Sequence, residues 1–366
     1  MINGFNHGGA EQGLLTLIRD GFFDGHELVV FGLCRGNGAL YDDIAASLPS
    51  GRLRLVTKST SLSFGALIRG VATIVRAVRR ERPAMVVLSL KQANIVGRLA
   101  LLFAPSVRCV SYEHTATYRA RRWLGVQSLL LRLLSLRVDE IWADCDETLE
   151  RSRRYFLRQV KRSHIVSMFG AGAGYPRKSG YAANTPFRLV AAGRLISLKN
   201  FALLIETIDS LKGTLDLSLD LFGEGEERSS LESLIARLGL SHSARLHGHV
   251  PEWFRQQAAL TADAFVNLSD TEGFCIVVAE AMAIGLPVIA TDVGGIRDYG
   301  RHRENMLKLT RPEQRLLLAA LIELAGNESL RRQMGSAARL DMLAHYNPAS
   351  TRVRGAEVLG TDRALY

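Results

Sequence analysis

The stretch Thr271–Thr291, TEGFCIVVAEAMAIGLPVIAT, decides the fold of the second half of the chain. A polar turn leads into an apolar run that ends at Gly285 and Pro287, a pattern typical of a helix between two strands. Glu280 is almost the only polar residue of that helix. A carboxylate in a helix that is apolar on all sides should be buried, and burial is costly unless the carboxylate is hydrogen-bonded. A structural partner and the hydroxyls of a ligand both meet this need.

The turn before this helix has the features of an anion site. Glu272 lies just before the helix, and Gly273 allows a ligand to approach the backbone closely. The N–H groups of residues 274–277 have no partner within the helix, so we expect them to attract an anion.

A second segment, Val190–Asn200, adds two cations. Its strand is predicted to end at Gly193, and a helix begins near Lys199. Because a cation at a helix N-terminus opposes the macrodipole, Arg194 and Lys199 are expected to share one anion with that terminus. A diphosphate fits, since Arg offers a fork of donors and Lys a point charge. The alternative is that both are solvated surface cations.

Around these segments, short apolar strands alternate with helices. The strands are apolar throughout, which indicates burial on both faces and a parallel sheet, so each half of the chain is predicted to be a doubly wound α/β domain. The predicted strands are Glu27–Leu33, Arg52–Val56, Ala84–Leu90, Val107–Tyr112 and Glu140–Ala143, then Phe187–Ala192, Leu215–Phe222, Ala244–His247, Ala264–Leu268, Pro287–Ala290 and Met306–Leu309.

The alternation breaks after Phe169, where a segment rich in glycine predicts a linker. The predicted domains are residues 1–175 and 176–345, with 346–366 as a helix that crosses back to the first domain. Only Met1–Asn6 precedes a helical pattern that begins by Glu11, so either the first strand is very short or the chain start is truncated.

Charge is distributed unevenly along the 366 residues. The formal net charge is +10, and residues 1–180 hold 26 Lys and Arg against 14 Asp and Glu, whereas the rest hold 20 against 22. The basic half favours an anionic partner: nucleic acid, anionic lipid or a phosphorylated acceptor. Solvated surface charge is the alternative. A hydrophobic fraction of 47% fits a soluble globular protein.

The cysteines indicate a reducing compartment. None of the four has metal-clip or redox spacing to another, and most lie in apolar stretches. We find no signal peptide and no apolar run long enough to span a bilayer, so the expected location is the cytoplasm.

The motifs together resemble a known family. Glu272 and Glu280, with the intervening helix and the Gly-Leu-Pro-Val-Ile-Ala-Thr that follows, resemble the signature of retaining family-four glycosyltransferases with the GT-B fold. Gly193, Arg194 and Lys199 resemble the phosphate-binding pair of that family. Three more glycine motifs resemble its N-terminal glycine loop and its next two strand ends: Gly8 and Gly9, Gly223, and Gly248.

The resemblance implies a fold and a role for each residue. The fold would be two doubly wound Rossmann-like parallel-sheet domains facing across a cleft. Glu280 would bind the ribose and Glu272 the sugar hydroxyls, and His114 would lie near the transferred sugar. The amides of Gly273, Phe274 and Cys275 would meet the sugar, and those of Ile276 and Val277 the phosphates. Cys275 stands where glycine is commoner, so its side chain would narrow the sugar pocket.

The resemblance also implies an activity. A hexose would move, with retained configuration, from a nucleoside-diphosphate sugar to a hydroxyl of a glycan or lipid-linked acceptor, with UDP-sugar favoured over GDP-mannose. Glu272, Arg194, Lys199 and His114 would be the catalytic set. No metal or other cofactor is expected, since no Asp-x-Asp cluster lies near the motifs. Polysaccharide, lipopolysaccharide or glycolipid assembly is the common use of such enzymes.

One segment suggests contact with a membrane. Arg119–Leu136 combines basic residues, Trp123 and a leucine-rich helix, as interfacial amphipathic segments do. Packing of this helix on the first sheet is the alternative. Contact here would make the enzyme peripheral on the inner face of the cytoplasmic membrane.

Four other functions compete with this interpretation. One is a non-enzymatic sugar-binding or scaffold protein, for which Glu272 and Lys199 would be dispensable. An NAD-dependent Rossmann protein is weakly supported, because Leu221–Arg228 has only the first two glycines of that fingerprint. A nucleotide-sugar epimerase on the same architecture is a closer rival. A nucleic-acid-binding protein is suggested only by the basic first half, without zinc spacing or an RNA-binding aromatic pattern, and we expect no nucleic acid as a partner.

Overall fold

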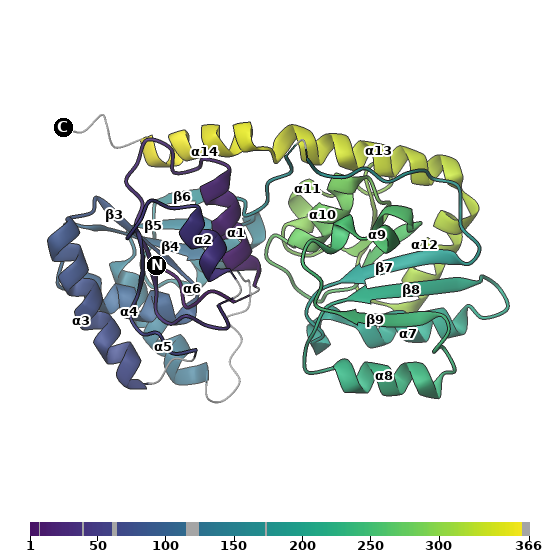
Figure 1. Cartoon of the computed structure of the whole chain (residues 1–366), viewed down its shortest axis with the longest axis horizontal. Coiled ribbons are helices and arrows are strands. Elements are labelled where there is room, and N and C mark those ends of the chain that lie inside the picture. Colours follow the sequence, from purple (N-terminus) through teal and green to yellow (C-terminus); the bar gives the residue numbers. More distant parts are fainter. Residues whose placement is uncertain (7, 39, 61–63, 115–123, 173, 361–366) are drawn as a thin grey trace. The chain divides into compact units, whose positions relative to one another are not determined.

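The protein folds into two compact units (Figure 1). The computed structural model describes residues 1–6, 8–38, 40–60, 64–114, 124–172 and 174–360. The first unit comprises Met1–Gly170 and the C-terminal segment from Pro348, and the second comprises Ala171–Asn347. The boundary therefore lies slightly before the predicted one at residue 175, and α14 (Pro348–Gly360) belongs to the first unit.

The second unit is built on one parallel sheet of six strands in the order β12-β11-β10-β7-β8-β9. Its strands are apolar and mostly buried, because helices cover both faces. The strand bounds are β7 (Phe187–Ala192), β8 (Leu217–Phe222), β9 (Ala244–Gly248), β10 (Ala264–Asn267), β11 (Val288–Thr291) and β12 (Leu307–Leu309).

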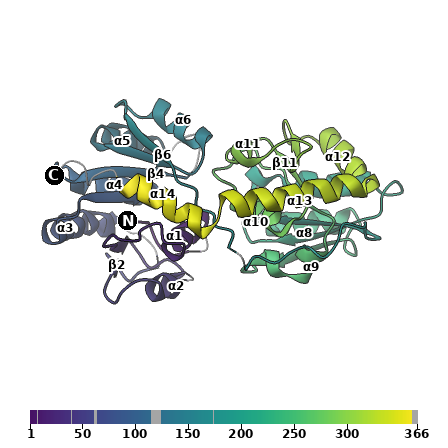
Figure 2. The same ribbon diagram turned by 90° about the horizontal axis from the view of Figure 1, so that it is seen from above.

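Two helical layers enclose this sheet. The main core joins α7 (Phe201–Ser210), α8 (Arg228–Arg237) and α12 (Gln314–Gly326) to one face of the sheet. On the other face α10 (Ile276–Ile284) packs against β11 and α13 (Glu328–His345), and Figure 2 shows α10 beside α13. Short helices complete the unit: η2 (Ser197–Lys199), η3 (Trp253–Arg255), α9 (Gln257–Thr261) and α11 (Ile296–Tyr299).

The first unit repeats this plan with a short central strand. The segment Met1–Asn3 lies between β1 and β3: the Ile2 N–H donates to Phe31 O at 2.9 Å, and the Ser89 N–H donates to Met1 O at 2.9 Å. It thereby joins the pair β1-β2 to the sheet β3-β4-β5-β6. The strand bounds are β1 (Val30–Gly32), β2 (Leu53–Leu55), β3 (Met85–Ser89), β4 (Arg108–Glu113), β5 (Glu140–Ala143) and β6 (Arg162–Ile165).

The helices of the first unit are α1 (Gly9–Arg19), α2 (Tyr41–Ala46), α3 (Phe64–Glu81), α4 (Lys91–Leu101), α5 (Leu124–Leu134), η1 (Ser135–Arg137), α6 (Asp146–Tyr155) and α14. Among the described helices, none combines the length and apolar character needed to cross a bilayer. Part of the predicted membrane segment, Arg119–Trp123, lies outside the described residues. Helix α5 packs on α4 with Leu131 and Leu134 buried, while Leu129, Leu133 and Leu136 are at least half exposed.

The prediction of two α/β domains with parallel sheets is confirmed. One strand, β6, was not predicted from the sequence. Its residues are polar or only partly buried because β6 pairs with β5 alone, at the edge of the sheet. The apolar pattern of a strand buried on both faces is therefore missing from Arg162–Ile165.

The ends of β7 and β8 approach each other closely at Gly223, and a substitution of this glycine tests that approach. A Cβ on Gly223 would lie 1.8 Å from Gly193 O, and the residue has a φ of +148°. Gly213, with a φ of +79° and nothing within 4 Å of a Cβ, is a matched control that reports backbone strain alone.

We expect Gly223→Ala to lower the free energy of unfolding by roughly 3 kcal/mol or more. Gly213→Ala should cost only about 1 kcal/mol, the strain of a left-handed alanine. Urea denaturation of both variants measures the difference. Equal losses would contradict the close approach of the two strand ends.

Candidate active site

The site lies where the order of successive strands in the sheet of the second unit reverses. From β7 the chain builds outward through β8 and β9, and then returns to place β10 on the other side of β7. In such a sheet the loops after the two central strands diverge, and the crevice between them is the usual ligand site. Here Gly193 follows β7 and Asn267 ends β10, so both predicted motifs start at this point.

A buried ion pair joins the two loops. Lys199 Nζ lies 2.5 Å from Glu272 Oε1, with the two side chains only 13% and 11% exposed. The Ser269 hydroxyl donates to the same oxygen at 2.5 Å. Asn200, which precedes α7, donates to Leu268 O at 2.9 Å and ties the backbone of the two loops together.

The pair keeps both groups charged at neutral pH. Burial by itself raises the pKa of Glu272, but the neighbouring Lys199 ammonium more than reverses this, so the pKa is lowered overall. Burial likewise lowers the pKa of Lys199, and the Glu272 carboxylate outweighs it, so that pKa is raised. Removal of either partner would leave the other as an unpaired buried charge.

Arg194 is a second cation at the same place and has a different environment. Its side chain is exposed, and within the described ranges no salt bridge or side-chain hydrogen bond engages it. Its charge also lowers the pKa of Lys199, which shows that the guanidinium and the ammonium are electrostatically coupled. Arg194 is therefore available to an anion from solvent.

The N-terminus of α10 faces this region with its first amides. Cys275 caps the helix with a φ of 65°, a left-handed conformation that glycine adopts without strain. The N–H groups of Ile276 and Val277 begin the helix and have no acceptor inside it. The Gly295 N–H donates to Gly273 O at 2.7 Å and holds the preceding turn in place.

Glu280 lies one turn further along α10 and is held by Trp253. The indole Nε1 donates to Glu280 Oε2 at 2.7 Å. Burial raises the pKa of Glu280 to about 8; the Trp253 hydrogen bond lowers it, and the charge of Glu252 adds to the rise. The side chain of Glu280 keeps partial contact with solvent, so its carboxyl group is accessible to a ligand.

Aromatic side chains connect Trp253, the partner of Glu280, to the glycines that follow β8 and end β9. The rings of Trp253 and Phe222 lie 6.1 Å apart, centroid to centroid, and Phe222 stacks on His247 at 4.7 Å. Phe222 ends β8, and the next residue, Gly223, donates its N–H to Gly248 O at 2.7 Å. The structure therefore brings Gly193, Gly223, Gly248 and Glu280 to one edge of the sheet.

The remaining predicted residues lie in the first unit. Gly8 is the N-cap of α1, and Gly9 is its first residue. His114 follows β4; its Nε2 lies 2.7 Å from Ser89 Oγ, and its ring packs on Tyr112 with centroids 4.2 Å apart. Burial lowers the pKa of His114 to about 3, so the imidazole is neutral at physiological pH. Among the described residues, His114 Nδ1 is a buried atom without a hydrogen-bond partner.

Three supporting residues were missed from the sequence. Trp253 contacts Glu280 across 27 residues of sequence, and Ser269 contacts Glu272 from the turn. Gly295, in the loop after β11, supports the turn at Gly273. The Gly294-Gly295 pair after a strand was a signal for a tight turn. No pattern in the sequence indicated that Trp253 contacts Glu280.

The raised pKa of Glu280 gives a testable dependence of stability on pH. Between about pH 4.5 and 8 the folded protein holds a proton on Glu280 that the unfolded chain releases. Stability contributed by this group therefore falls as the pH rises through that window. Between pH 5 and pH 8 the free energy of unfolding of Glu280→Gln should rise by roughly 2–4 kcal/mol relative to that of the wild type.

Urea denaturation at several pH values measures this gain. Glu226→Gln, which removes an exposed carboxylate of the same unit, is the matched control. If the free energies of unfolding of both variants depend on pH between 5 and 8 as that of the wild type does, the carboxyl group of Glu280 is ionised at neutral pH. The raised pKa assigned to Glu280 would then be wrong.

Comparison with known proteins shows what the second unit is similar to. Residues 177–341 match the family model described as "Glycosyl transferases group 1". A human subunit of phosphatidylinositol N-acetylglucosaminyltransferase is 33% identical over 143 residues, 37% of this chain and 29% of that protein. The lipopolysaccharide core biosynthesis glycosyltransferase LpsE of Rhizobium meliloti is 32% identical over 146 residues, 40% of this chain and 42% of that protein. The chain thus covers less than half the length of either relative.

Solved structures resemble the whole chain. HepE of Anabaena, crystallised in complex with UDP, has a TM-score of 0.79 at 18% identity, covering 98% of this chain and 99% of that one. The lipopolysaccharide outer core galactosyltransferase WaaB has a TM-score of 0.71 at 14% identity and 98% coverage of both chains. At these identities the likeness shows the fold. The chain therefore has the GT-B fold of glycosyltransferases, and residues 177–341 of its second unit match the model of glycosyl transferases group 1.

Proposed function

We propose that this protein transfers a hexose from a nucleoside-diphosphate sugar to a hydroxyl group of an acceptor. One observation carries the proposal: the crevice of the second unit unites two cations, a helix N-terminus and two carboxyl groups. Cations and amides suit a diphosphate, and carboxyl groups suit ribose and sugar hydroxyls. The match of residues 177–341 to the model of glycosyl transferases group 1 supports the same chemistry.

The diphosphate is the part of the donor that these cations would hold. An ammonium has three N–H donors, and the contact with Glu272 uses one of them, so Lys199 keeps donors for a phosphate oxygen. Arg194 adds its exposed guanidinium, and Ile276 and Val277 add their amides. These groups would stabilise the negative charge that develops on the departing nucleoside diphosphate. The site would then need no metal ion.

The carboxyl groups would recognise the two sugars of the donor. Glu280 shares Oε2 with Trp253, so Oε1 is the atom that would meet the ribose hydroxyls. Glu272 receives Lys199 and Ser269 on Oε1, so Oε2 would accept from the transferred sugar. The amides of Gly273, Phe274 and Cys275 would line the same sugar. His114, which is neutral and has a free Nδ1 among the described residues, is proposed to hydrogen-bond the sugar from the first unit.

We favour a UDP-sugar as donor over GDP-mannose. HepE was crystallised with UDP and with UDP-glucose, and relatives carry names that mention N-acetylglucosamine. We further propose that the acceptor hydroxyl attacks on the face that the nucleotide leaves, so that the configuration is retained. Gly8 and Gly9 would allow the donor to approach the backbone of the first unit.

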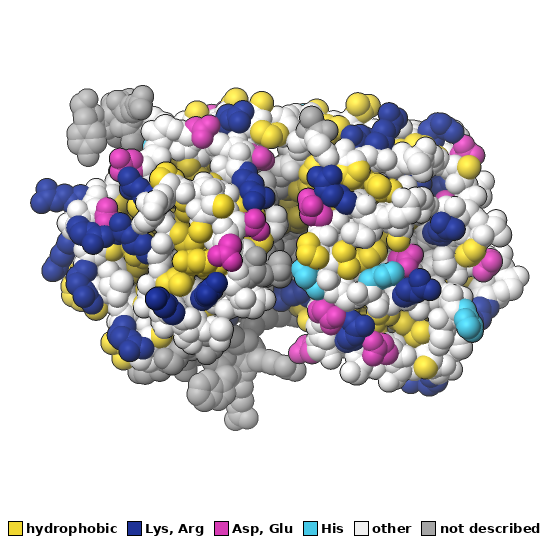
Figure 3. Space-filling model, in the orientation of Figure 1, with side chains coloured by type: hydrophobic (Ala, Val, Ile, Leu, Met, Phe, Trp, Pro, Cys, Tyr) yellow, Lys and Arg dark blue, Asp and Glu magenta, His cyan; other side chains and the backbone are white. Residues whose placement is uncertain are grey.

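The acceptor is proposed to be a glycan or a lipid-linked glycan at an anionic membrane surface. The basic first half of the chain and the exposed Leu129, Leu133 and Leu136 support this. In Figure 3 the visible face of the first unit carries an apolar area with Lys, Arg, Asp and Glu side chains around it, and the second unit also shows both signs of charge. Cosedimentation with anionic vesicles tests the membrane part, and unbound protein would refute it.

Donor binding and product stereochemistry test the function directly. UDP should raise the melting temperature more than GDP or ADP, since a ligand at 100 times its Kd stabilises by about 2.7 kcal/mol.

With an α-linked UDP-sugar and an acceptor glycan, NMR should find an α-linked product, and EDTA should leave the rate unchanged. A β-linked product would exclude retention. Conversion of the free UDP-sugar to its epimer would favour an epimerase.

Arg194 allows a test of the phosphate site without loss of the fold. Because the side chain is exposed and in no salt bridge of the described structure, Arg194→Gln should leave the melting temperature unchanged. It should lower kcat/KM by about 100-fold, because the transition state would lose one hydrogen-bond donor to its developing negative charge. Arg245→Gln removes an equally exposed cation from β9 and should retain full activity. Equal activity of the two variants would remove Arg194 from the site.

A further inference from the structure

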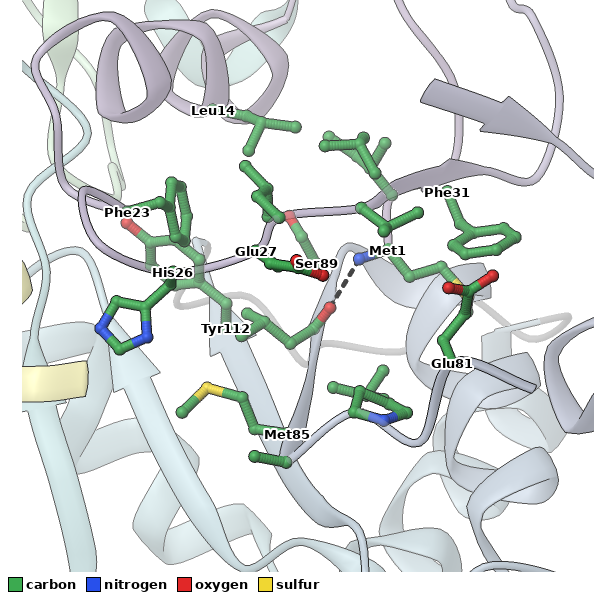
Figure 4. A pocket seen from close by; sticks show the side chains of 18 of the residues that line it. Met1, Leu14, Phe23, His26, Glu27, Phe31, Glu81, Met85, Ser89 and Tyr112 are labelled. Carbon is green, nitrogen blue, oxygen red and sulfur yellow. Dashed lines mark hydrogen bonds between the residues drawn. The ribbon is translucent and has the colours of Figure 1, made fainter. Parts of the chain in front are cut away.

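The chain is not packed equally closely everywhere. The first unit contains a cavity of about 630 Å³, and Figure 4 shows Leu14, Phe31 and Met85 around it. The second unit is close-packed at the turn of residues 272–275, where a Cβ on the neighbouring Gly295 would lie only 2.8 Å from a carbonyl oxygen of the turn. The backbone of this turn therefore has little room to move.

Donors from the segment after β11 hold three successive carbonyl oxygens of the turn. The Gly295 N–H donates to Gly273 O at 2.7 Å. The Tyr299 hydroxyl lies 3.0 Å from Phe274 O and 3.2 Å from Cys275 O. A tyrosine hydroxyl has a single proton, so the two oxygens share it in a three-centre hydrogen bond.

Each held carbonyl fixes the amide that follows it. A peptide group is planar and trans, so its C=O and the N–H of the next residue point in opposite directions. The Tyr299 hydroxyl therefore fixes the directions of the Cys275 and Ile276 N–H groups. The Gly295 N–H fixes that of Phe274 in the same way. These three amides are among those proposed to meet the sugar and the diphosphate.

Tyr299 is itself held firmly in place. It is only 5% exposed, and its ring packs against Phe274 and Tyr346 with centroids 5.2 and 6.4 Å away. Its backbone oxygen accepts from Asn305 Nδ2 at 2.9 Å, and the same amide donates to Asp341 of α13 at 2.9 Å. Because the ring and the backbone are both fixed, the hydroxyl is preorganised to hold the turn.

The conformation of Cys275 makes this support necessary. Its φ of 65° lies in the left-handed region, which a residue with a side chain avoids. Release of Phe274 O would let this φ return to a negative value, and the Cys275 N–H would rotate away from its present direction.

We propose that Tyr299 is a positioning residue of the donor site, whose hydroxyl orients the amides of Cys275 and Ile276 toward the sugar and the diphosphate. The proposal rests on the proposed function and deepens it, because Tyr299 acts on the donor through the turn. The ring alone would keep the packing of the turn but would not hold its carbonyl oxygens.

The test compares Tyr299→Phe with Tyr181→Phe in the full chain. The Tyr181 hydroxyl donates to Gly285 O at 3.0 Å, at the opposite end of α10, and Tyr181 is 8% exposed. Each variant loses one buried hydrogen bond from a tyrosine to a backbone oxygen. Both melting temperatures should therefore fall by a similar amount, roughly 2–4 °C.

Donor binding should separate the two variants. By calorimetry, the Kd for UDP should rise about tenfold in Tyr299→Phe and stay within about twofold of the wild-type value in Tyr181→Phe. With a UDP-sugar and an acceptor, kcat of Tyr299→Phe should fall by a larger factor than KM rises, because the Ile276 amide would stabilise charge that develops only in the transition state.

The orientation of the turn can be measured without a ligand. A chain labelled with ¹⁵N at its four cysteines gives four amide signals in an NMR spectrum, and the signal missing from Cys275→Ser is that of Cys275. Tyr299→Phe should move this signal and leave the other three in place, whereas Tyr181→Phe should move none.

An unmoved Cys275 signal in Tyr299→Phe, or equal affinities of the two variants for UDP, would overturn the proposal and leave the proposed function intact. A wild-type protein that binds none of UDP, GDP and ADP would refute the proposed function. The role of Tyr299 in donor binding would then be refuted with it, even if the Cys275 signal moves.

Discussion

The order of parallel strands around β7 and β10 is the constraint on which the candidate site depends. Because β8 and β9 extend to one side and β11 and β12 to the other, the loops after β7 and β10 turn away from each other and leave a crevice between them. No side chain in the site has to create this opening. The sequence needs only to place charged and small residues directly after the strands, and it does so at Gly193, Arg194 and Glu272.

Within that crevice, charge is organised in two ways. Lys199 and Glu272 neutralise each other, so neither is an unpaired buried ion. Arg194 stays in water, where an unpaired cation costs nothing. A diphosphate would therefore meet one cation that is fixed in place and one that is free to move. This division would allow the second unit to bind an anion although its sequence carries slightly more acidic than basic residues.

Sequence patterns predicted the elements whose causes are local. The apolar helix after Gly273, its end at Gly285 and the strand that ends before Gly193 all follow from nearby residues, and the structure has them at these places. The α/β class followed from the alternation of such elements. Strand β6 was missed because an edge strand lacks the apolar signature. Trp253 was missed because its role is a contact with Glu280, and no local pattern encodes which distant side chain a buried indole meets.

The N-terminal strand shows a similar limit. Six residues before a helix indicated either a short strand or a shortened chain start, and the sequence could not say what surrounds them. The structure shows that Met1–Asn3 lie between β1 and β3 and pair with both. Hydrophobicity alone predicted β1 and β3 but could not show that this short segment lies between them.

The four cysteines have a practical consequence. All are buried and none forms a disulfide, and burial raises the pKa of Cys34, Cys109 and Cys275 above that of a free thiol. Thiolates are the form that reacts with maleimides and oxidants, so the native cysteines should be slow to label. A single cysteine introduced on the surface of each unit would then carry a fluorophore pair selectively, and energy transfer between the dyes would measure the distance between the two labelled positions in solution.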